Sequence, residues 1–191
     1  MTEKLKVERT RNFSAHHMLI GAARAALEDA EKKMTGWFYN ELIAMVMCAL
    51  SIEAISNAVG ERVIPNWRDF ESSSPIAKLR IICQKLEIEY GQNKEPWSTA
   101  KWLSKFRNSI AHAKPELVDE EQVWTREEYE KRRADHPKSK IESDITLGNA
   151  KRALQEVERI KDLLCEKIPA DDALGLYSDA WVGSAKLAND D

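Results

Sequence analysis

Residues 37–59, WFYNELIAMVMCALSIEAISNAV, decide the fold of this 191-residue chain. Apolar side chains recur there at helical spacing, and additional apolar residues widen the stripe until it nearly surrounds the helix. A helix that is apolar on almost every side lies at the centre of its domain. We therefore expect a central helix that begins near Trp37, after the helix-breaking Gly36, and ends at Gly60.

Amphipathic stretches on both sides of this segment predict the other helices. Start signals support them: Ser14 is a candidate N-cap, Ser74 precedes a proline, and Thr125 and Glu128 have the spacing of a capping box. The chain has only 7 glycines and 6 prolines, too few for the turns of a many-stranded fold. The long helices are expected at 14–33, 37–59, 75–86, 96–113 and 144–168, with a short charged one at 125–134. The predicted class is all-α, a helical bundle of four to five long helices.

The expected domain organisation follows from the same pattern. Residues 1–13 are polar and predicted to be a flexible N-terminus, and residues 14–168 form the helical domain. Residues 116–143 are a charged insertion in that domain, polar and mobile from Asp135 to Ser143. Residues 169–191 form a C-terminal tail, in which 173–187 is a candidate for one more short helix.

Composition excludes several classes of protein. Charged residues are 32% of the chain and the net charge is −3, so bulk electrostatic wrapping of nucleic acid is not expected. The three cysteines, Cys48, Cys83 and Cys165, are widely spaced and have no neighbouring histidines, which argues against disulfides and zinc. We expect no cofactor and no metal. The start of the chain has no signal peptide, and the apolar run 42–52 is shorter than the ~20 residues of a membrane span. These features predict a cytoplasmic protein with no membrane contact.

The helix expected at 96–113 carries the most informative residues. On a helical wheel, Leu103 and Phe106 fall on its buried stripe, and Arg107 lies on the flank of that stripe. Asn108 and His112 are four residues apart and share a face that points away from the core. His112 is therefore either a plain surface residue or a residue that faces a groove or a partner.

The charge around this helix differs from that of the whole chain. Residues 92–114 contain five cations and one anion, and the cations include Lys101, Lys105 and Lys114. A basic strip on an acidic protein attracts anions such as phosphate, although a solvated helix face has the same composition. Lys101, Lys105 and Lys114 are therefore the predicted phosphate-binding residues, and they become the RNA-binding residues under the family resemblance described below.

Arg107, Asn108 and His112 suit phosphodiester chemistry. Histidine can give or take a proton near neutral pH, as cleavage of a phosphodiester requires. Arginine offers a planar set of donors for phosphate oxygens as charge develops on them. Asn108, one turn before His112, can hold either the imidazole ring or a phosphate oxygen.

The stretch FRNSIAH, residues 106–112, resembles the signature of the HEPN superfamily, the higher eukaryote and prokaryote nucleotide-binding domains. That signature is Arg, four to six residues and His, very often with Asn after the Arg. The family's early helix often carries a polar residue toward the site. Glu53 and Asn57 match that feature and share a face, so they are the predicted supporting residues.

The resemblance implies a metal-independent endoribonuclease that acts as a homodimer, with two motif copies meeting at the interface. The expected reaction is attack of the RNA 2′-hydroxyl on the adjacent phosphate, with His112 as acid or base and Arg107 as phosphate clamp. It also implies a toxin–antitoxin or anti-phage setting, with a possible cognate antitoxin or regulatory protein. In one helix, Arg107 and His112 are roughly 140° and about 7.5 Å apart. Two copies could build one composite cleft.

Two alternatives stay open from the sequence. One is a non-catalytic HEPN module that binds RNA, a nucleotide or a partner protein; the other is a helical interaction protein whose exposed His112 is accidental. A second Arg-x4-His match, Arg11 to His16, is expected to be incidental, because Arg11 precedes its helix and His16 lies in the first turn. Otherwise His16 or His17 contributes to a shared cleft.

Overall fold

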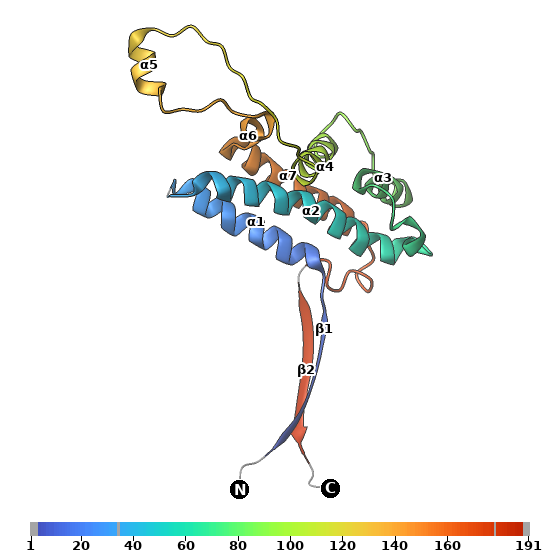
Figure 1. Ribbon diagram of the computed structural model, residues 1–191. Coiled ribbons are helices and arrows are strands. Elements are labelled where there is room, and N and C mark those ends of the chain that lie inside the picture. The colour runs from blue at the N-terminus through green and yellow to red at the C-terminus, as the bar shows by residue number, and fades with distance from the viewer. Residues whose placement is uncertain (1–3, 34, 178, 189–191) are drawn as a thin grey trace.

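The computed structural model describes residues 4–33, 35–177 and 179–188, so parts of the predicted terminal segments lie outside the described residues. The chain is mostly helical (Figure 1). The helices are α1 (Ala15–Glu31), α2 (Trp37–Val63), the 3-10 helix η1 (Trp67–Phe70), α3 (Pro75–Lys85), α4 (Trp97–Ala111), α5 (Arg126–Arg132), α6 (Lys140–Asp144) and α7 (Leu147–Cys165). Two strands, β1 (Leu5–Asn12) and β2 (Ala180–Leu187), form the sheet.

Helix α2 is central, as its apolar sequence predicts. It contacts α1, α3, α4 and α7, and it buries Met45, Cys48, Ile52 and Ile55 almost completely. By length and composition alone α2 could span a membrane, but half of its most apolar window is buried against the rest of the chain. The core helix of a soluble protein has the same properties.

The predicted end of α2 at Gly60 is wrong, because the helix continues to Val63. Gly60 serves packing instead. A β-carbon at Gly60 would lie 2.3 Å from the Trp67 ring, so the missing side chain makes room for the indole. Trp67 is 5% exposed and stacks on Phe70, with ring centroids 5.7 Å apart.

Several predicted helix starts agree with the structure. The Ser74 hydroxyl accepts a hydrogen bond from the Ala77 amide, and Thr125 and Glu128 form both bonds of a capping box. The stretch predicted as mobile and polar, 135–143, contains the start of α6. Ser139 and Glu142 form a second capping box there, which the sequence reading missed.

The predictions for both ends of the domain are wrong where the structure describes them. The segment expected to be a flexible N-terminus contains β1, and the tail segment 173–187, a candidate for a short helix, contains β2. The two strands pair antiparallel, from Leu5 opposite Leu187 to Asn12 opposite Ala180. They form a ribbon that projects away from the helices (Figure 1). The whole helical region separates these strands in the sequence, so their pairing depends on α1 and α7 bringing the two ends together.

The three cysteines are buried and free. Burial raises the pKa of the Cys48 and Cys83 thiols to about 12 and that of Cys165 to about 11. All three thiols are therefore protonated near neutral pH and serve as small apolar core residues.

Candidate functional site

Arg107 lies near the end of α4, with its side chain 41% exposed. Its Nη1 donates a hydrogen bond to Asn108 Oδ1 at 3.0 Å, and its Nη2 lies 3.9 Å from Glu53 Oε2 on α2. The structure thus brings together Arg107, Asn108 and Glu53, three of the residues that the sequence singled out. The guanidinium is oriented from two sides and keeps an exposed part that an anion can reach.

A fourth residue, Lys78 on α3, completes this cluster and was missed by the sequence reading. Its side chain is 1% exposed, and its Nζ lies 3.4 Å from Glu53 Oε1. A buried ammonium needs a partner, because removing a charge from water is strongly unfavourable. Glu53, itself 33% exposed, therefore bridges one buried cation and the motif arginine. No spacing rule marks Lys78, because only the packing of α3 against α2 buries it.

His112 is the C-cap of α4, immediately after the last helical residue. Its backbone N–H donates to the Asn108 carbonyl at 3.0 Å, and the residue is exposed. Within the described residues, no hydrogen bond or ion pair joins the His112 ring to another group. One copy of the chain therefore presents the imidazole to solvent rather than to Arg107.

The other predicted residues differ in exposure. Lys101 is half-buried, whereas Lys105 and Lys114 are exposed. Asn57 is exposed on α2, one turn after Glu53, and no hydrogen bond joins it to Arg107 among the described residues. Lys101 and Lys105 on α4 and Lys114 just beyond its end thus offer cations to an approaching anion, and Asn57 belongs to a neighbouring groove.

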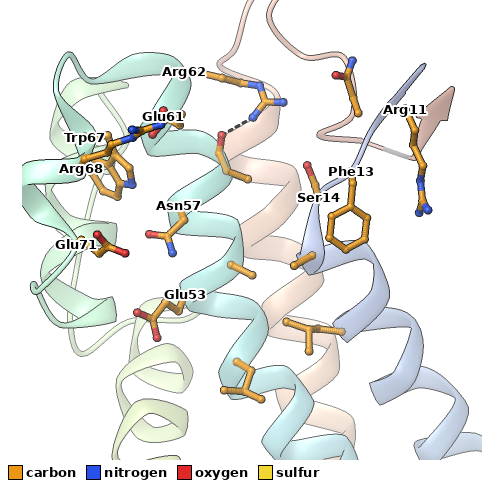
Figure 2. Close-up of a pocket in the computed structure, with 16 residues that line it drawn as sticks. Arg11, Phe13, Ser14, Glu53, Asn57, Glu61, Arg62, Trp67, Arg68 and Glu71 are labelled. Carbon is orange, nitrogen blue, oxygen red and sulfur yellow. Dashed lines mark hydrogen bonds between the residues drawn. The ribbon is translucent and has the colours of Figure 1, made fainter. Parts of the chain in front are cut away.

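That groove has a volume of about 1030 Å³ and crosses the C-terminal half of α2 (Figure 2). Glu53 and Asn57 project from α2 toward the side of η1, and Phe13 and Ser14 lie on the opposite side. Arg62 at its rim is held by three carbonyl oxygens, those of Ala58, Asp172 and Leu174. The groove connects the Arg107 cluster with the base of the β-ribbon.

The second Arg-x4-His match has a structural role. His16 is 1% exposed and its Nε2 lies 3.0 Å from the Leu176 carbonyl, while His17 Nε2 lies 3.0 Å from the Gly175 carbonyl. Burial lowers the pKa of His16 to about 4, so its ring is neutral near pH 7 and donates to Leu176. These contacts attach the C-terminal segment to the start of α1.

The tryptophans near the motif are mainly packed. Trp97 is 3% exposed and its indole N–H donates to the Glu89 carbonyl at 3.1 Å. Trp102 stacks on Phe106 and lies under the Arg152 guanidinium. Trp124, on the insertion, is half-buried. Trp97 and Trp102 therefore stabilise α4 rather than offer a free stacking surface.

Among the residues that the structure describes, no group of three or more His, Cys, Asp or Glu side chains is placed to hold a metal ion. Comparison with known proteins gives no match: no protein-family model, no curated protein and no solved structure is similar to this chain. The function must therefore be argued from the residues and their geometry.

Proposed function

We propose that this chain is a metal-independent endoribonuclease of the HEPN type, built on a helical bundle over residues 14–168. The observation that supports it best is the oriented Arg107, held by Asn108 at 3.0 Å and by Glu53 at 3.9 Å, five residues before an exposed His112. An oriented guanidinium and an exposed imidazole together suit phosphodiester chemistry, because the guanidinium binds the phosphate oxygens and the imidazole moves protons. Among the described residues of one copy no hydrogen bond joins the two groups, so a second copy would have to bring them together.

In the proposed reaction, the RNA 2′-hydroxyl oxygen attacks the adjacent phosphorus and forms a P–O2′ bond. The P–O5′ bond breaks, which leaves a 2′,3′-cyclic phosphate and a free 5′-hydroxyl. One His112 side chain takes the 2′-hydroxyl proton, and either the same side chain or the His112 of a second copy gives a proton to the leaving 5′-oxygen. Arg107 binds the non-bridging oxygens as negative charge builds on them. Lys101, Lys105 and Lys114 attract the flanking phosphates.

We propose a homodimer in which a second copy completes the site. An exposed apolar stripe on α2 supports this: Tyr39 is 66% exposed and Ile43 42%, and the same helix face continues through Val46 and Leu50. An apolar stripe that stays open on an otherwise buried core helix is typical of an interface. Glu53 lies at the edge of the stripe and contacts Arg107. A second copy packed on this stripe would lie beside Arg107 and could supply its own His112 imidazole.

RNA cleavage in excess EDTA tests the catalytic proposal, with wild type compared with His112→Ala. We expect the wild type to cut a mixed RNA panel and leave cyclic phosphate ends, and the His112→Ala variant to lose at least ~100-fold in rate. His136→Ala is the matched control, since His136 is an exposed histidine on the insertion, and it should cleave normally. Cleavage that EDTA abolishes, or that survives in His112→Ala, would contradict the proposal.

The alternative is a non-catalytic HEPN module that binds RNA, a nucleotide or a partner protein. It is favoured by the separation of the two groups in one copy, where Arg107 is paired with Glu53 and no hydrogen bond or ion pair joins the His112 ring to a described residue. A folded, dimeric protein that binds RNA through Arg107 but cuts no RNA would support this alternative. In either case, a toxin or anti-phage role with a cognate antitoxin remains part of the proposal, because it rests on the family resemblance.

A further inference from the structure

The β-ribbon stands apart from the helices, with both of its edges free of other described strands (Figure 1). All eight residues of β1 are exposed, and so are Trp181, Val182 and Leu187 on β2. A two-stranded ribbon with no packed face is marginally stable in water. A ribbon with strands this long therefore indicates that a binding partner or ligand contacts it.

The charge of the ribbon indicates the chemistry of that contact. Lys6, Arg9, Arg11 and Lys186 are cations and Glu8 is the one anion in β1 and β2, whereas the whole chain has a net charge of −3. Arg11 forms an ion pair with Asp179 at the base of the ribbon. The outer part of the ribbon is thus a basic arm on an acidic protein.

One strand pair opposes like charges. Lys6 lies directly opposite Lys186, an arrangement that destabilises an antiparallel ribbon. Glu8 contacts Lys6 at 3.0 Å, but among the described residues no ion pair reaches Lys186 or Arg9. Destabilising pairs such as this one are expected at functional sites. An anion bound between the Lys6 and Lys186 ammonium groups would relieve their repulsion.

The ribbon also presents an aromatic ring beside a cation. A β-carbon at Gly183 would lie 3.3 Å from Arg9 Cγ and 3.3 Å from Trp181 Cζ3, so both side chains flank the same glycine. Trp181 is 67% exposed. Single-stranded nucleic acids are bound by this combination, in which phosphates contact cations and bases stack on aromatic rings.

We propose that the β-ribbon is an RNA-binding arm: Lys6 and Lys186 contact phosphates on one face, and on the other face Arg9 contacts a phosphate while Trp181 stacks on a base. Naming RNA as the ligand rests on the proposed function. Two other partners fit these residues less well. The ribbon of a second copy would place like charges together, and an acidic peptide has no nucleobase to stack on Trp181. RNA offers phosphates to the cations and bases to Trp181. The groove at the base of the ribbon leads toward Glu53, which contacts the motif residue Arg107.

Binding of a labelled oligouridine of about 20 nucleotides tests the arm by fluorescence anisotropy. All proteins carry His112→Ala, so that cleavage does not interfere. Replacing Lys6, Arg9 and Lys186 by glutamine removes three phosphate contacts, so the slope of log K against log salt should fall by about 2. Affinity should be about 100-fold weaker at ~0.1 M salt and nearly equal at ~1 M. Trp181→Ala should weaken binding about tenfold at both salt concentrations.

The matched control replaces Lys33, Lys85 and Lys167, three exposed cations on the helical body, by glutamine and should keep the parent's slope. A ribbon variant that binds with the affinity and slope of this control would overturn the proposal, as would a parent that binds no RNA. A ribbon variant that becomes monomeric at unchanged RNA affinity would identify a subunit contact instead. The readout is binding, so weaker binding by the ribbon variants supports the arm even if the wild type proves unable to cleave.

Discussion

The ion pair between Lys78 and Glu53 predicts a strong asymmetry between two substitutions. Glu53→Ala leaves the Lys78 ammonium, 1% exposed, without the carboxylate that lies 3.4 Å away. Removing one partner of a buried pair lowers stability by about 3–5 kcal/mol. Glu53 is itself 33% exposed, so we expect the lower end of that range, about 3 kcal/mol.

The reverse substitution should be much milder. Lys78→Met puts an apolar chain of similar length into a buried position, and it leaves Glu53 near water and 3.9 Å from Arg107. We expect a loss of about 1 kcal/mol. The double variant contains neither buried charge and should resemble Lys78→Met, which gives a coupling free energy of about 3 kcal/mol between the two residues.

Urea unfolding, followed by tryptophan fluorescence, measures these free energies, provided that the variants share one m-value. The control cycle uses Lys94 and Glu89, an ion pair of similar length, 3.3 Å, with side chains 78% and 85% exposed. It should show almost no coupling. If Glu53→Ala were no more destabilising than Lys78→Met, then Lys78 would reach water in solution, and the reasoning would fail.

Three further predictions concern the rest of the fold. Burial holds the pKa of His16 at about 4 in the folded protein, below the ordinary value of about 6.5, so its contribution of about 3 kcal/mol to the free energy of unfolding is complete above pH 6.5 and disappears as pH falls toward 4. Urea unfolding of His16→Gln should lack this loss. Gly60→Ala should lower the thermal midpoint, because the clash with Trp67, about 1–3 kcal/mol, outweighs the gain of about 1 kcal/mol in helix propensity. The cysteines should react with iodoacetamide only at the rate of unfolding, and rapid alkylation of the folded protein would contradict their burial.

Sequence patterns predicted local features well, because those depend on neighbours in the chain. The caps at Ser74 and Thr125 and the apolar surface of α2 are examples. The predicted end of α2 at Gly60 is wrong because the absence of a side chain there makes room for Trp67, seven residues later in the sequence, and does not end the helix.

The candidate site was predicted in part. Arg107, Asn108 and Glu53 were named from the sequence and lie together, since two of them are adjacent in α4 and the third lies on the early helix that the resemblance pointed to. His112 lies at the C-terminal end of α4, close to the predicted helix end at 113, but no hydrogen bond or ion pair joins its ring to a described side chain. Lys78 could not be found, because a lysine becomes significant only when packing removes it from water.

The sequence alone determined the helical class, the central position of α2 and the helix that carries the motif, because helical periodicity and capping are local and repeat along the chain. Tertiary structure alone decided that Lys78 is buried against Glu53, that His16 holds Leu176, and that the two ends of the chain pair as strands. Each of these contacts joins residues far apart in the sequence. Such contacts form only when the folded helices bring those residues together, which no periodicity within a single segment can specify.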